Sequence, residues 1–200
     1  LSTNANSSDP NTGGFMTDGA GSNATTQIAY APENWGIAAA YTYASGENGP
    51  GLYIGNANLE AAILSALGNT NSIGLSAWWM PEDSGIIPSI SVGYGGSWID
   101  LDGDDDAYTN SWYVGLEWSD AFVEGNSLGM AVGQPTYIVS VDDDAYTEGA
   151  GYAWELFYKF QVTDNISVTP AITYLSKPFP SQDSDGMSAF SGLIKTQFKF

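Results

Sequence analysis

Three residue types that build reactive or cross-linked sites are missing from the chain of 200 residues, which contains no cysteine, no histidine and no arginine. Without cysteine no disulfide can form, and without cysteine and histidine no zinc, haem-thiolate or iron–sulfur site of the usual kinds can be built. Serine and cysteine catalytic triads also lose their base or their nucleophile. These absences exclude many classes of enzyme.

Positive charge is scarce as well. Four lysines stand against 23 acidic side chains, which gives a net charge of −19. Affinity for nucleic acid comes from neutralising phosphates with lysine and arginine. Nucleic acid is therefore not an expected partner.

Long apolar runs are absent too. No stretch approaches the ~18 consecutive apolar residues of a membrane helix. The first residues show no basic region followed by an apolar run, so we expect a mature chain or one cut from something longer. Strands of a membrane barrel cross in ~9–11 alternating residues, which hydropathy averages hide.

Glycine and aromatic residues are abundant. The chain has 24 glycines, 14% aromatic residues and only 14% charged residues, against a usual charged fraction of roughly 25%. Disordered chains have few aromatics and little apolar surface. The composition favours many strands joined by turns.

The hydrophobic pattern repeats every second residue. In residues 190–200, Phe190 and Phe198 share one face, while Ser191 and Lys195 share the other. The same alternation occurs in segments 25–31, 35–43, 73–80, 90–94, 112–118, 128–132, 154–162 and 166–174. This period is typical of strands with two different environments, so the sequence predicts an all-β protein with about nine strands.

The expected connections between these strands alternate in length. Short connections are expected at 32–34, 81–85, 119–126 and 163–165, and long ones at 45–71, 99–109, 136–151 and 176–188. Short turns at one end and long loops at the other are the layout of an antiparallel up-and-down transmembrane barrel. We therefore predict an outer loop segment in residues 1–23 and barrel strands in residues 24–200.

The apolar and polar faces of the strands differ in a way that favours a channel. The apolar faces carry large rings near the strand ends, including Trp35, Tyr41, Trp112, Trp118, Trp154 and Tyr158, and such rings favour the membrane interface. The opposite faces carry charges that a dry core could not hold unpaired. We predict that Glu117, Glu155, Lys159, Lys195 and Lys199 line a water-filled pore, where charge sets selectivity. The alternative is that the lysines are paired or solvated without any such role.

The expected long loops contain most of the acidic residues. Two clusters are Asp102, Asp104, Asp105 and Asp106, and Asp142, Asp143 and Asp144. They predict a negative outer mouth that concentrates cations. The run from Asp100 begins like a calcium-binding loop, but Asp105 stands where glycine is required and Ser111 where glutamate is required. No defined metal site is predicted, and loose binding of divalent cations remains an alternative.

Enzyme chemistry has little support. Paired carboxylates can hydrolyse glycosides without histidine or cysteine, and the candidate pairs are Asp104 with Asp142 and Glu117 with Glu155. No apolar pocket that would raise a carboxyl pKa is evident. We predict no enzymatic activity and no cofactor.

Several phrases of the sequence resemble a known family. The run from Trp118 to Pro135 resembles a hairpin of cyanobacterial outer-membrane porins of the carbohydrate-selective, OprB-type family. Residues 172–178 and 191–200 resemble the last two strands of the same family, and the likeness covers the chain from about residue 24 onward. The terminal Phe198-Lys-Phe200 matches the usual ending of outer-membrane barrels.

The resemblance implies a location and a set of partners. It implies a barrel of about sixteen strands in the outer membrane, of which this chain is the C-terminal part. The remaining strands would come from missing sequence or from another chain, and a homo-oligomer such as a trimer is implied as well. The expected function is passive diffusion of inorganic ions and sugars. The alternatives are a soluble β-sandwich that binds carbohydrate through exposed rings, and a wall-anchoring structural protein.

Overall fold

A computed structural model describes residues 2–4, 21–45, 68–82, 85–101, 106–142, 144–145, 151–177 and 187–199. These residues form strands and their connections, and no helix among them is long and apolar enough to cross a membrane. The predicted acidic residues Asp102, Asp104, Asp105 and Asp143, and the terminal Phe200, lie outside the described residues.

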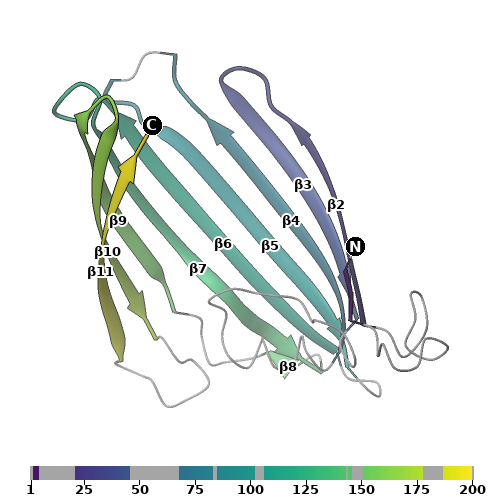
Figure 1. Ribbon diagram of the computed structural model, residues 1–200. Coiled ribbons are helices and arrows are strands. Elements are labelled where there is room, and N and C mark those ends of the chain that lie inside the picture. Colours follow the sequence, from purple (N-terminus) through teal and green to yellow (C-terminus); the bar gives the residue numbers. More distant parts are fainter. Residues whose placement is uncertain are drawn as a thin grey trace.

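Nine long strands make up one antiparallel sheet (Figure 1). They are β2 (Gly21–Tyr30), β3 (Trp35–Ala44), β4 (Asn69–Trp79), β5 (Ser89–Asp100), β6 (Asp106–Ser119), β7 (Ser127–Val141), β9 (Ala153–Thr163), β10 (Ile166–Ser176) and β11 (Ser188–Phe198). Two short strands, β1 (Ser2–Asn4) and β8 (Asp144–Ala145), pair with β2 and β7. Each long strand pairs with the next one along the chain, so the all-β, up-and-down prediction is confirmed.

In-register pairing sorts the side chains onto two faces. One row across the sheet joins Leu75, Tyr94 and Trp112, and another joins Val92, Val114 and Val132. Because side chains alternate along a strand, the residues between these rows all point the other way. We call the side that carries these rows the apolar face and the opposite side the polar face.

The two ends of the sheet differ in their connections. In Figure 1 the strand ends that the β2–β3, β4–β5, β6–β7 and β9–β10 connections join lie at the top, and the opposite strand ends lie at the bottom. Lys199 lies at the same end as these four turns, because its backbone nitrogen donates to the carbonyl of Asn165 at 2.9 Å. We call this the turn end and the opposite one the loop end.

One predicted loop is much shorter than expected. The connection 101–105 at the loop end is shorter than the connection 80–88 at the turn end, so the strict alternation of short and long connections is wrong. The ladder continues because Ile99 and Ala107 form a buried pair, and the ring of Trp98 packs on that of Tyr108 with centroids 5.2 Å apart. Asp106 therefore begins β6 and does not lie in a loop.

Strand β7 also runs further than predicted. The expected loop from residue 136 is strand as far as Val141. Pro135 lies in this strand where the register with β6 shifts between Asn110 and Trp112. A bulge of this kind accommodates a residue that has no N–H for the ladder.

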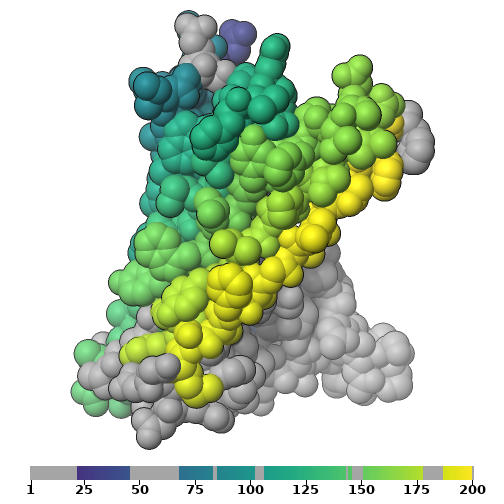
Figure 2. All heavy atoms as spheres, turned by 90° about the vertical axis from the view of Figure 1, so that its left-hand side faces the viewer, coloured from purple at the N-terminus to yellow at the C-terminus, as the bar shows by residue number. Residues whose placement is uncertain are grey.

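Both sides of the sheet are open among the described strands. Strand β11 pairs with β10 alone, and the other side ends with the short β1 against β2. Figure 2 shows β11 as a yellow diagonal band that lies along one side of the molecule, and its residues are exposed throughout. Backbone groups on such an edge would be unpaired in lipid, where each costs several kcal/mol, at about 2–7 per group.

Asn126, Ser127 and Ser167 are buried at the turn end, but most of the buried side chains lie at the loop end of the polar face. They include Ala44, Thr70, Ile99, Ala107, Thr109 and Ile138, from β3 to β7. The hydroxyl oxygens of Thr70 and Thr109 are buried without a hydrogen-bond partner. The side chains at this end of the polar face are therefore buried, whereas Glu117, near the turn end of β6, and Glu155 on β9 are exposed.

Candidate pore-lining face

The apolar face is exposed although its side chains are large. Trp154, Leu156 and Phe198 are 46%, 44% and 60% exposed. Soluble monomers rarely expose a contiguous apolar surface of this extent. The described strands form one sheet with no second layer across these rings, which is not the arrangement of a β-sandwich.

Aromatic residues cluster at the turn end of the apolar face. Tyr30 and Trp35 make an edge contact with centroids 5.5 Å apart, and Tyr158 and Phe160 make another at 4.6 Å. The indole nitrogen of Trp118 donates to the backbone carbonyl of Ile86 at 2.9 Å. Rings with a satisfied polar tip and an apolar body suit the border between lipid and water.

A second aromatic cluster lies at the loop end of the same face. The hydroxyl of Tyr41 donates to the side-chain oxygen of Asn71, and that of Tyr94 donates to Asn110, both at 2.6 Å. The indole nitrogen of Trp112 donates to the side-chain oxygen of Gln134 at 2.7 Å. The apolar face thus has an aromatic girdle at each end, as outer-membrane barrels do.

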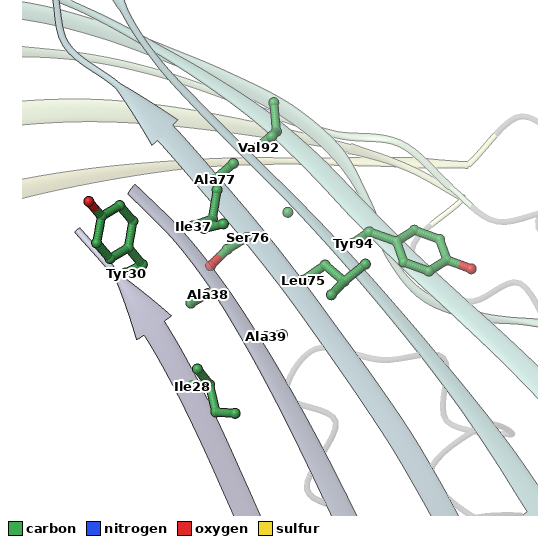
Figure 3. Close-up of a pocket in the computed structure, with 11 residues that line it drawn as sticks. Ile28, Tyr30, Ile37, Ala38, Ala39, Leu75, Ser76, Ala77, Val92 and Tyr94 are labelled. Atoms are coloured by element: carbon green, nitrogen blue, oxygen red, sulfur yellow. The ribbon is translucent and has the colours of Figure 1, made fainter. Parts of the chain in front are cut away.

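Aliphatic residues fill the band between the girdles. From Trp35 to Tyr43 the strand covers about 26 Å at ~3.3 Å per residue, less when tilted, which is comparable to the ~25 Å apolar band of such barrels. Within the band a hollow of about 480 Å³ opens where Ala39 and Ala77 lie among larger side chains (Figure 3). This face has the dimensions and chemistry of a surface in contact with hydrocarbon.

The polar face carries both predicted glutamates. Glu117 on β6 lies opposite Gly129 on β7, and Glu155 on β9 lies opposite Ala131 on β7. Both carboxylates are exposed and flank the same strand, so the structure brings Glu117 and Glu155 onto one surface.

The predicted lysines share this surface but lie closer to the turn end. Lys159 is opposite Ser127, and Lys195 is opposite Thr169. Lys159 is four residues from the turn end of β9 at Thr163, whereas Glu155 is eight residues from it. Lys199 follows β11 at the turn end. In the described part of the chain, no ion pair joins these three lysines to Glu117 or Glu155.

The first four long strands line the polar face differently from the later ones. Strands β2 to β5 place no charged residue on it, and their hydroxyl groups bond to one another. Thr25 bonds to Thr42 at 2.9 Å, and Ser72 bonds to Ser97 at 2.8 Å. All the charges of this face therefore lie on the β6–β11 half.

Four acidic residues that the structure describes lie on neighbouring strands at the loop end. Asp106 lies opposite Asp100 at the loop end, on the side of the sheet that carries Trp98 and Tyr108. The backbone nitrogen of Asp142 donates to the carbonyl of Asp106 at 2.8 Å, and Asp144 begins the short β8. All four are exposed. Among the described residues no group of three ligands could hold a metal ion.

Three aromatic residues of the polar face were not predicted as site residues. Trp78, Tyr113 and Phe157 lie over Gly36, Gly93 and Gly129 of the preceding strands, where an added Cβ would collide with each ring. A ring placed this way lies against the sheet and does not stand out from it. The feature that identifies these residues is an aromatic residue paired with a glycine on the neighbouring strand. This pairing cannot be read from the sequence until the register of the strands is known.

Taken together, one curved up-and-down sheet with a girdled apolar face and a charged polar face is the wall of a transmembrane β-barrel. A family model described as "Carbohydrate-selective porin, OprB family" matches residues 4–200. The chain belongs to this family, which confirms the resemblance seen in the sequence.

Two cyanobacterial relatives match the whole chain. The uncharacterized protein alr4550 of Nostoc sp. is 32% identical over 214 residues, and the uncharacterized protein sll0772 of Synechocystis sp. is 29% identical over 224 residues. The chain spans 35% of the first relative and 40% of the second. No solved structure matches the chain at a significant level.

Proposed function

We propose that this chain is part of the wall of an outer-membrane channel through which small hydrophilic solutes, inorganic ions and sugars, diffuse passively. The observation that carries the proposal is the sorting of side chains: exposed rings and aliphatic residues on one face, and Glu117, Glu155, Lys159 and Lys195 on the other. Water on the polar face solvates these charges, whereas a dry interior would not. No enzymatic step is part of the proposal.

A complete channel needs more strands than the chain provides. The free edges of β11 and of the β1–β2 side must pair before the sheet can stand in lipid. The match to little more than a third of each relative leaves room for further strands in the same polypeptide. The proposed barrel portion starts near β2, which begins at Gly21.

The charges of the polar face suggest a graded path for ions. Glu155 lies two residues from the loop end of β9, and Lys159 and Lys195 lie towards the turn end. The two signs oppose one another, so we expect weak net selectivity. When Lys159 and Lys195 are both changed to glutamine, the carboxylates are the charges that remain on this part of the wall. The measured cation-to-anion permeability ratio should then rise about twofold or more.

The proposal is tested with the full-length natural polypeptide that contains these residues, reconstituted into planar lipid bilayers. We expect stepwise, ohmic conductance in potassium chloride and a reversal potential that moves towards cation selectivity in the double lysine variant. A protein that stays in the aqueous phase without detergent, or one that inserts without conducting, contradicts the proposal.

A further inference from the structure

The polar side of the β5–β6 pair has an unusual composition. Three successive cross-strand pairs each join one side chain to one glycine: Ser111 with Gly95, Tyr113 with Gly93, and Ser91 with Gly115. A Cβ added at Gly95 would lie 2.6 Å from the Ser111 hydroxyl oxygen, and one at Gly115 would lie 2.6 Å from that of Ser91. These pairs form a strip in which a single layer of side chains covers the glycines: the hydroxyl of Ser111, the ring of Tyr113 and the hydroxyl of Ser91.

The ring of Tyr113 lies over Gly93 at the centre of this strip. A Cβ at Gly93 would lie 2.8 Å from the Cδ1 atom and 3.0 Å from the Cζ atom of the ring, so the ring covers the glycine backbone. Tyr113 is nevertheless 47% exposed, so its other face is open. Because the glycine fixes the ring, little further ordering is needed when a ligand stacks on it.

Hydroxyl groups surround the open ring face. Ser111 is two residues from Tyr113 on β6, about 6.6 Å away, and Ser91 is its diagonal neighbour on β5, about 7–8 Å away. The two serines therefore lie on opposite sides of the ring, each about the width of one pyranose from it. Ser76 on β4 is paired with Gly93 and adds a third hydroxyl on the same face. The three pairs contain no charged residue, and the nearest charge along β6 is Glu117, beyond Gly115.

We infer that Tyr113, flanked by Ser91 and Ser111, binds neutral sugars as they pass through the channel. A pyranose has an apolar C–H face that stacks on a ring and a rim of hydroxyls that bond to serines, which matches this strip. An inorganic ion would gain little from it, because ions follow the charges of β6–β11. The inference deepens the proposed function and rests on it.

The test uses single-channel currents of the full-length polypeptide in potassium chloride, with glucose added as the probe. We expect glucose to interrupt the current in a concentration-dependent way. Tyr113→Ala should weaken the apparent affinity for glucose about three- to tenfold. Tyr113→Phe should retain it because the ring remains. Gly93→Ala should also weaken it, because the added methyl lifts the ring off the sheet.

Phe157→Ala is the matched control. Phe157 covers Gly129 in the same manner but lies between the charged residues Glu155 and Lys159, and the serine beside it, Ser127, is buried, so its removal should leave glucose affinity unchanged. Unchanged affinity in Tyr113→Ala, or an equal loss in Phe157→Ala, shows the inference to be wrong. A channel that conducts salt but is never interrupted by glucose also overturns it and leaves the channel intact. A polypeptide with no conductance contradicts the proposed function itself.

Discussion

The two faces of the sheet use aromatic residues in opposite ways. On the apolar face the rings stand outward in two girdles, where Tyr94 and Trp112 bond to polar neighbours. On the polar face Tyr113 and Phe157 lie over glycines. Aromatic residues thus anchor the apolar face in lipid, whereas on the polar face they project little from the sheet. The two roles differ in the residue at the paired position on the neighbouring strand, because a glycine there leaves space for the ring above its backbone.

The largest expected effect comes from placing one charge on either face of β7. Val132→Arg puts a cation among Val114 and Trp154 on the apolar face and should lower the free energy of unfolding by about 2–4 kcal/mol. Ala131→Arg, one residue earlier, faces Glu155 on the polar side and should cost less than about 1 kcal/mol. Urea unfolding of the full-length protein in lipid vesicles measures both. A greater cost for Ala131→Arg would reverse the assignment of the faces.

A smaller effect comes from disturbing a ring on the polar face. Gly129→Ala forces Phe157 away from the sheet and should cost about 1–3 kcal/mol through overpacking, with a lower conductance because the ring enters the lumen. Gly192→Ala is the same substitution on the apolar face, where the nearest atom is the Ala171 carbonyl oxygen at 3.9 Å. It should be neutral or stabilising by up to about 1 kcal/mol. Equal costs at the two glycines would show that the ring–glycine pairing has no special role.

The smallest effect concerns the buried loop end of the polar face. Thr109→Val removes a buried hydroxyl that has no partner and should stabilise the protein by about 1 kcal/mol. Thr42→Val removes a hydroxyl that bonds to Thr25 and should cost about 0.5 kcal/mol. Unfolding midpoints compare the two. A greater loss in Thr109→Val than in Thr42→Val would mean that the Thr109 hydroxyl is satisfied.

Much of this organisation follows from local pattern. Alternation in segments such as 154–162 and 166–174 predicted the strands and placed Glu117, Glu155, Lys159 and Lys195 on one side, because side-chain direction in a strand depends on neighbours along the chain. The strand count and the up-and-down order followed from the same alternation and from the turns between segments.

What local pattern missed depends on pairing between strands. The extension of β5 and β6 to Asp100 and Asp106 depends on Trp98 meeting Tyr108, and the extension of β7 through Pro135 depends on a bulge against β6. Tyr113 has no special feature until Gly93 is found opposite it. Such contacts are set by register, which a hydrophobic period alone does not specify.

The chain contains no cysteine, which allows a direct test of which face meets water. Single cysteines introduced along β7 from Leu128 to Val132, in a full-length background free of other cysteines, are treated in intact membranes with a charged, water-soluble maleimide. We predict modification at residue 131 and protection at 128, 130 and 132, whereas residue 129 lies under the ring of Phe157 and is not used to assign the faces. Modification of Val132→Cys with protection of Ala131→Cys, or equal labelling of both, would contradict a water-filled channel on the polar face.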